Sequence, residues 1–301
     1  HIYLHGYLAY GFLDKQYKWK TDILWIMKRH PRHTLYASYG YDLSFSQSYY
    51  IDAQSNNLLT VTIRKPGIPR KFVMLRETML RYSGETKNGF TGTVIFRNRN
   101  YDPLAVIPGK IYYPTKSGIP LNTSEISFRL RYAYVEKFFE TNFNRFSFGS
   151  EFPIADIEFT QGIKGVLQSS YTYQRLAASI NDYMSISPFG KLEWLVYGGK
   201  VFGTLPYVFL QVHPGNEVYY YNKYAFNLMH QYEYISDGYA GFAVENNFGS
   251  GIFKFIPFTR KLKFRQFWNV RGIVSNLSSS NAALNNTGVY EFKSLDNKLY
   301  L

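Results

Sequence analysis

The sequence predicts an all-β protein, an antiparallel up-and-down transmembrane β-barrel with about fourteen strands in this chain and about sixteen when complete. Three observations predict this class: apolar and polar residues alternate along many runs, aromatic residues are in excess, and short connections alternate with long ones. Aromatics make up 19% of the 301 residues, with 29 Tyr and 25 Phe against 4 Trp. Tyr and Phe favour strands and the aromatic girdles of membrane barrels.

Runs of period two mark the expected strands, because successive side chains of a strand point to opposite faces. The expected strands lie near 2–13, 19–29, 33–43, 72–83, 90–98, 123–135, 141–149, 166–186, 191–203, 223–235, 239–248, 263–276 and 289–300.

The stretch 226–248 is expected to be a hairpin that turns at Ser236-Asp237-Gly238. Glycine after Asp is typical of a short hairpin turn, since glycine takes positive φ without a Cβ clash. Folding about Asp237 puts the aromatic residues of both runs on one face and the polar residues on the other. In a soluble β-sandwich the aromatic face would lie in a core, whereas in a membrane barrel it would face lipid.

The connections favour the barrel over the sandwich. In an up-and-down barrel, successive connections emerge at opposite ends, so the alternation places short turns at one end and long loops at the other, as in outer-membrane barrels. Greek-key sandwiches mix short and long connections at both ends. The short turns are expected at 30–32, 84–88, 136–140, 187–190 and 236–238, and the long loops at 44–71, 99–122, 150–165, 204–222 and 249–262.

The same alternation assigns side chains to the two faces of the expected barrel. The polar residues expected to face the lumen are Arg129, Arg131, Glu233, Glu245, Arg265 and Arg271. The aromatic residues expected to face lipid are Phe128, Tyr132, Trp194, Tyr232, Phe242 and Trp268. An ion pair between Glu233 and Arg271, crossing over Gly241, is a further hypothesis, because a residue without a Cβ leaves space between the two chains.

Composition and motifs exclude several function classes. With no cysteine, the chain has no disulfide, no thiolate nucleophile and no Cys-based metal site. No apolar run reaches the roughly 18 residues of a spanning helix. The net charge of +13 is spread over small clusters such as 28–33, 64–71 and 259–265, which favours anionic lipid headgroups or a positive pore over nucleic acid. We expect no catalytic residues, no metal and no cofactor, and the motif at 30–33 indicates a polar turn.

Several phrases together resemble a known family, among them "RYSGETKNGFTGTVIFRNR", "EFPIADIEFTQGIKGVL" and "VRGIVSNLSSSN". They are similar to the C-terminal outer-membrane barrel of uncharacterised Bacteroidetes-type proteins that carry an N-terminal carboxypeptidase-regulatory-like domain. The resemblance covers about residues 72–281. It extends distantly to barrel-assembly and two-partner-secretion transporters, whose Arg-Gly motif lies in an inward-folded loop, whereas Arg271-Gly272 here lies in an expected strand.

The expected function is that of an outer-membrane β-barrel in transport, secretion or envelope assembly, without covalent chemistry. Residues 1–301 are expected to be one barrel domain, truncated at both ends. The expected location is the bacterial outer membrane, and the expected partners are its lipids and periplasmic or other envelope proteins. An outer-membrane lipid hydrolase is the enzymatic alternative, and a soluble secreted β-sandwich or carbohydrate-binding module is the second alternative.

Overall fold

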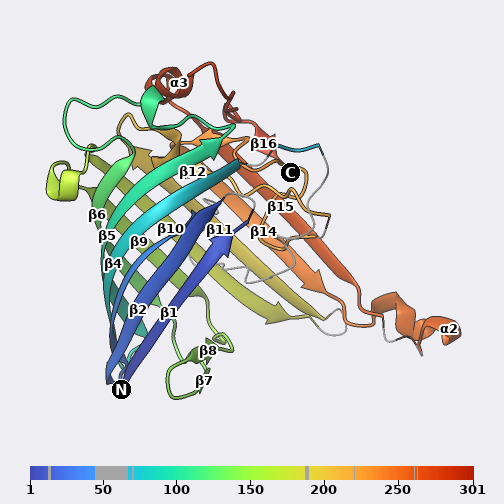
Figure 1. Ribbon diagram of the computed structural model, residues 1–301. Helices are drawn as coiled ribbons and strands as arrows, with labels where there is room; N and C mark the ends of the chain where they lie inside the picture. Colours follow the sequence, from blue (N-terminus) through green and yellow to red (C-terminus); the bar gives the residue numbers. More distant parts are fainter. Residues whose placement is uncertain are drawn as a thin grey trace.

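The computed structural model describes residues 1–12, 15–44, 67–69, 71–186, 190–219, 221–260, 262 and 264–301. Its main feature is one antiparallel sheet of twelve strands in the order β1-β2-β3-β4-β5-β6-β9-β10-β11-β14-β15-β16. The strands follow one another side by side around a curved, twisted sheet (Figure 1). The all-β, antiparallel class is therefore confirmed, whereas the sandwich alternative, which needs two large facing sheets, does not fit.

The strands of the main sheet are β1 (Ile2–Gly11), β2 (Gln16–Lys28), β3 (His33–Ser44), β4 (Lys71–Glu85), β5 (Phe90–Ala105), β6 (Asn122–Tyr132), β9 (Ile154–Gly162), β10 (Tyr173–Ser185), β11 (Lys191–Phe202), β14 (Gly238–Asn247), β15 (Phe267–Asn276) and β16 (Leu299–Tyr300). The other elements are the two-stranded sheets β7 (Phe138–Glu140) with β8 (Arg145–Ser147) and β12 (Gln211–Val212) with β13 (Ile235–Ser236), the helices α2 (Pro257–Arg260) and α3 (Ser279–Asn285), and the short helices η1 (Lys110–Tyr112), η2 (Val166–Gln168), η3 (Tyr207–Phe209) and η4 (Gly251–Phe255).

The strand register gives the sheet two chemically different faces. One row of paired residues across four strands is Val94, Phe128, Phe159 and Leu176, and Phe128 is 53% exposed. The alternate residues of the same strands form rows such as Arg129, paired with Glu158. We call the first the apolar face and the second the polar face. Because side chains alternate along each strand, the two faces extend across the whole sheet.

The connections emerge at two ends of the sheet, since neighbouring strands run antiparallel. Among the described residues, the hairpin end carries 29–32, 86–89, 133–153, 186, 190, 248–260 and 264–266, and the loop end carries 12, 15, 67–69, 106–121, 163–172, 203–219, 221–237 and 277–298. In Figure 1, α3 marks the loop end, while the N-terminus, β7, β8 and α2 mark the hairpin end. Of the expected loops, 44–71 lies largely outside the described residues, as do positions 187–189 of an expected turn.

Residues 223–234 form no strand, and Ile235 pairs only in the short β13, so the expected hairpin about Asp237 is wrong. Tyr232 has a positive φ of 58°, which strand geometry does not allow. The turn 236–238 therefore joins the long connections at the loop end, and 249–262 lies at the hairpin end, opposite to the expected sorting. Conversely, β9 forms within the expected loop 150–165, and only Leu299–Tyr300 of the expected strand 289–300 is paired in the sheet.

The core lies on the polar-face side of the sheet, toward the loop end. The 203–237 connection packs there against strand residues such as Val73, Tyr101, Tyr173 and Val201. Phe209 of the connection is 1% exposed in this core. A second cluster joins Tyr197 and Ile273 to residues of the same connection. A long irregular segment thus supplies much of the apolar packing of this fold.

Candidate functional site on the polar face

Four of the six residues expected to face the lumen lie on the polar face. Arg129, Arg131, Glu245 and Arg271 occupy the rows that alternate with the apolar residues of β6, β14 and β15. Arg265 instead precedes β15 and is exposed. Glu233 belongs to the 203–237 connection, because residues 223–234 form no strand.

Five of the six aromatic residues expected to face lipid lie on the apolar face. Their register places Phe128, Tyr132, Trp194, Phe242 and Trp268 in its rows. The sixth expectation is wrong: Tyr232 is 2% exposed and belongs to the core under the 203–237 connection. A residue outside any strand has no face assignment, so the period-two argument could not place it.

Arg129 and Arg131 are paired with carboxylates. The guanidinium of Arg129 donates from Nε and Nη2 to Asp156 Oδ1, at 2.9 and 2.7 Å. Arg131 donates from Nη1 and Nη2 to the two carboxylate oxygens of Glu136, at 2.5 and 2.8 Å. The Arg131–Glu136 pair is bidentate and fixes the planes of both groups, whereas both bonds of Arg129 end on one oxygen of Asp156. The two pairs leave the polar face ordered and nearly neutral at this position.

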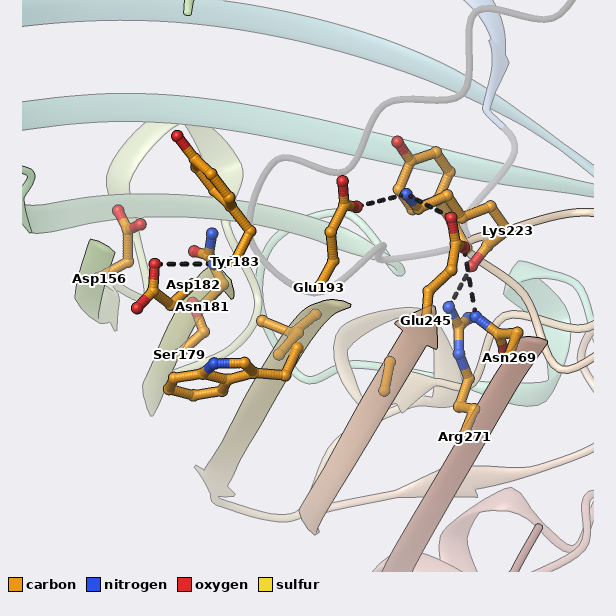
Figure 2. Close-up of a pocket in the computed structure, with 14 residues that line it drawn as sticks. Asp156, Ser179, Asn181, Asp182, Tyr183, Glu193, Lys223, Glu245, Asn269 and Arg271 are labelled. Atoms are coloured by element: carbon orange, nitrogen blue, oxygen red, sulfur yellow. Dashed lines mark hydrogen bonds and ion pairs between the residues drawn. The ribbon is translucent and has the colours of Figure 1, made fainter. Parts of the chain in front are cut away.

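A pocket of about 340 Å³ opens on the polar face between β9, β10, β11, β14 and β15. Its floor carries two carboxylates directly opposite each other, because Glu193 of β11 pairs with Glu245 of β14. Like charges in this arrangement repel. Lys223 of the 203–237 connection resolves the repulsion, with its Nζ 2.8 Å from Glu193 Oε2 and 3.2 Å from Glu245 Oε1. Figure 2 shows the two carboxylates converging on Lys223.

The pocket also contains the true partner of Arg271. Its Nη2 donates a hydrogen bond to the carbonyl oxygen of Lys223, whereas Glu233 forms an ion pair with Lys293 at 2.9 Å. The Glu233–Arg271 hypothesis is therefore wrong. The register explains the error, since Arg271 lies opposite Ala243 and Ile273 lies opposite Gly241.

Buried polar contacts hold the 203–237 connection against the sheet. Lys71 Nζ of β4 lies 3.1 Å from Glu217 Oε1, and both side chains are buried. The same ammonium donates to the carbonyl of Gln231 at 2.8 Å. From the other side, α3 supplies Asn281 and Asn285, whose Oδ1 atoms accept from the backbone N–H groups of Leu205 and Tyr207 at 2.8 and 2.7 Å.

Asp237 ends the connection in a set of charge-assisted contacts. Its carboxylate accepts from Lys200 Nζ at 2.9 Å, from the Ser278 N–H at 2.9 Å and from Asn281 Nδ2 at 3.0 Å. Burial alone would raise the pKa of Asp237, but the hydrogen bonds from Ser278, Lys200 and Asn281 outweigh it and lower the pKa to about 2. The carboxylate is thus a fixed negative anchor across the physiological pH range.

Among the described residues, His213 is the one fully buried histidine with serine hydroxyl groups beside its ring. Its Nε2 lies 3.0 Å from Ser236 Oγ and 3.2 Å from Ser275 Oγ. All three side chains are buried, and burial lowers the pKa of His213 to about 3. A general base works best with a pKa near the operating pH. The cluster therefore lacks both the access and the basicity that a hydrolase needs.

Of the two histidines at 30–33, His30 lies in the turn between β2 and β3, and His33 begins β3. His33 Nδ1 is 2.9 Å from Tyr82 Oη, and His30 Nε2 is 3.9 Å from Glu140 Oε2. Over the described part of the chain, no group of three or more His, Cys, Asp or Glu is arranged to hold a metal ion. Within the same residues, no helix has the length and apolar character to cross a membrane.

Residues 1–280 match the family described as "Family of unknown function (DUF5686) C-terminal domain". The chain belongs to this family. The match agrees with the expected membership in an uncharacterised family and extends it from about residue 72 to the first residue. A comparison with curated proteins found no match.

Sequence reasoning missed several residues of the site in this DUF5686 C-terminal domain. Alternation along 191–197 does place Glu193 on the polar side, but its pairing with Glu245 depends on the strand order. His213 and Glu217 lie in the expected loop 204–222, and Lys223 begins the expected strand 223–235, which does not form. Pro206, Pro214 and the glycines around them were the available signal that this segment is irregular.

Proposed function

We propose that this DUF5686 domain is an outer-membrane β-barrel that serves in transport, secretion or envelope assembly without covalent chemistry. The observation that carries the proposal is the pairing of a continuous, exposed apolar face with a polar, ion-paired face on one sheet. A soluble protein rarely exposes a large continuous apolar surface. Membrane barrels place such a face toward lipid and the polar face toward a lumen.

The proposal includes closure of the sheet. Among the described residues no ladder joins β1 to β16, so the sheet has two edges. Unpaired backbone groups at an edge are costly in a hydrocarbon environment. We therefore propose further strands between these edges, for about sixteen in all. The 203–237 connection would then fill the lumen toward the loop end.

The finer assignment follows the resemblance in the sequence. We propose a bacterial outer-membrane location of the Bacteroidetes type, with outer-membrane lipids and periplasmic or envelope proteins as partners, and a distant relation to barrel-assembly and two-partner-secretion transporters. The short turns 29–32 and 86–89 at the hairpin end support a periplasmic orientation of that end. The burial of His213 with its two serines disfavours the lipid-hydrolase alternative.

A matched pair of substitutions tests the proposal. Val196 of β11 lies on the apolar face and is 48% exposed. Ser179 of β10 lies close by on the polar face, because it pairs with Tyr197, the residue that follows Val196. In lipid, Val196→Arg would cost about 2–4 kcal/mol at mid-depth and reduce recovery of a heat-modifiable form from outer membranes, while Ser179→Arg would not. In a soluble domain, arginine at an exposed valine is nearly neutral. Equal recovery of both variants would overturn the proposal.

A further inference from the structure

The connection between β14 and β15 differs in composition from the rest of the hairpin end. Residues 249–266 read "GSGIFKFIPFTRKLKFRQ", with five basic residues and no acidic residue. Aromatic and aliphatic residues alternate with the basic ones throughout. This combination is typical of segments that lie in the interface of an anionic membrane.

The segment projects from the sheet as a small folded knob. It contains η4 and α2, and Figure 1 shows α2 away from the strands, at the hairpin end. Thr259 Oγ1 donates to the Phe253 carbonyl at 2.9 Å, and the rings of Phe253 and Phe264 lie 5.6 Å apart. At its base, the backbone N–H of Phe248 donates to the Gln266 carbonyl. The described residues of the knob therefore pack against one another and do not form an open loop.

The knob displays large apolar side chains in place of burying them. Phe255 is 76% and Phe258 is 79% exposed, and Ile256, Leu262 and Phe264 are exposed as well. Its apolar surface continues that of the sheet, because Phe248 contacts Trp268 of the apolar face at 5.4 Å between ring centroids. An exposed apolar surface in a segment whose only charges are positive fits a lipid interface better than water.

We propose that the knob 249–266 binds the surface of an anionic phospholipid bilayer, with Phe255, Phe258 and Leu262 below the headgroups and the net positive charge of the segment attracted to the phosphates. The inference rests on the proposed function in one respect: continuity with the apolar face places the knob at the level where the sheet leaves the membrane. Charge complementarity selects anionic lipid as the occupant, since the segment has no acidic residue for a basic partner.

Single cysteine substitutions can test the proposal, because the chain has no cysteine of its own. The full chain carrying Phe258→Cys is labelled with a polarity-sensitive dye and reconstituted into bilayers of zwitterionic lipid, with or without phosphatidylglycerol, that contain nitroxide-labelled lipid. We expect nitroxide quenching and a blue shift that increase with phosphatidylglycerol. Phe258 is exposed, so the label should not disturb packing. Lys87→Cys, in the turn 86–89 at the same end, is the matched control and should show neither effect.

Two further variants separate the outcomes. Val196→Cys on the apolar face reports insertion of the sheet itself. Quenching of the Val196→Cys label without quenching of the Phe258→Cys label overturns the knob proposal alone. Quenching of the Phe258→Cys label alone supports the knob proposal and overturns the barrel, and quenching of neither label overturns both. Replacing Arg260, Lys261 and Lys263 by Gln in the Phe258→Cys chain should remove most of the phosphatidylglycerol-dependent shift. A shift that survives these replacements would overturn the role of charge.

Discussion

Single residues of the 203–237 connection carry charge states that depend on the fold. His213 stays neutral because its ring is fully buried, and Asp237 stays charged because three donors converge on it. Lys223 is the counter-charge for two glutamates that face each other across a strand pair. None of these states can be predicted from residue type alone, because each depends on partners that are distant in sequence.

Acid should destabilise the fold through His213. Its pKa is lowered from 6.5 to about 3 by burial, so between these values the unfolded chain binds a proton that the folded chain does not. Stability therefore rises with pH across this window and is lost as pH falls from about 6.5 toward 3, by a few kcal/mol in all. Denaturant unfolding in detergent at pH 7 and pH 4 measures the loss, which His213→Asn should reduce. Exposed His230→Asn is the control and should leave the loss unchanged.

Removing Lys223 should leave Glu193 and Glu245 in mutual repulsion. Lys223→Met is expected to cost about 0.5–1 kcal/mol, since the groups are partly exposed and solvent weakens the pair. Adding Glu245→Gln should recover much of this cost by removing the repulsion. A double-mutant cycle on unfolding free energies measures the coupling. Independent, additive effects of the two substitutions would contradict the cation-bridge interpretation.

At the scale of the element, the sequence predicts strands well where each strand has two chemically distinct faces. The period of β6, from Ile126 to Tyr132, survives intact in the structure. The prediction of a strand failed for 226–235. The sequence alternates there, but the buried residues recur every third position, at Phe226, Met229, Tyr232 and Ile235. β9 was missed because Asp156 and Glu158 look like loop residues until Arg129 and Arg131 lie beside them.

Glycine-aromatic contacts between neighbouring strands were likewise not predictable, because they require the register. A Cβ on Gly241 would lie 2.6 Å from Tyr197 Oη and 2.8 Å from the Gly272 carbonyl. Gly241→Ala should therefore cost about 1–3 kcal/mol, measured by unfolding in detergent. Gly92→Ala is the control, because a Cβ there meets nothing within 4 Å. Tyr197→Leu should recover part of the loss, and an equal cost for both glycines would contradict this account.

At the scale of the whole molecule, one sheet and one long connection depend on each other. The sheet offers a polar face that needs partners toward the loop end, and the connection offers buried apolar and charged groups that only this face can satisfy. The sequence predicted the sheet and its two faces. It did not predict the long connection, which was expected to be a loop at 204–222 followed by a strand at 223–235. The segment that fills the polar face was therefore the least predictable part of the candidate site.

Releasing the connection should open the proposed lumen. Lys71→Met would leave the buried carboxylate of Glu217 without its ammonium partner, at a cost of about 3–5 kcal/mol. The protein avoids this cost if the 203–237 connection detaches from the polar face, because the carboxylate is then hydrated. In planar lipid bilayers, the wild-type chain should then conduct little, and Lys71→Met should conduct more. Lys71→Met combined with Glu217→Leu removes both charges, so it should restore the low conductance. Heat-modifiable migration shows that each variant is folded, and equal conductance of folded wild type and Lys71→Met would contradict a plug held by this ion pair.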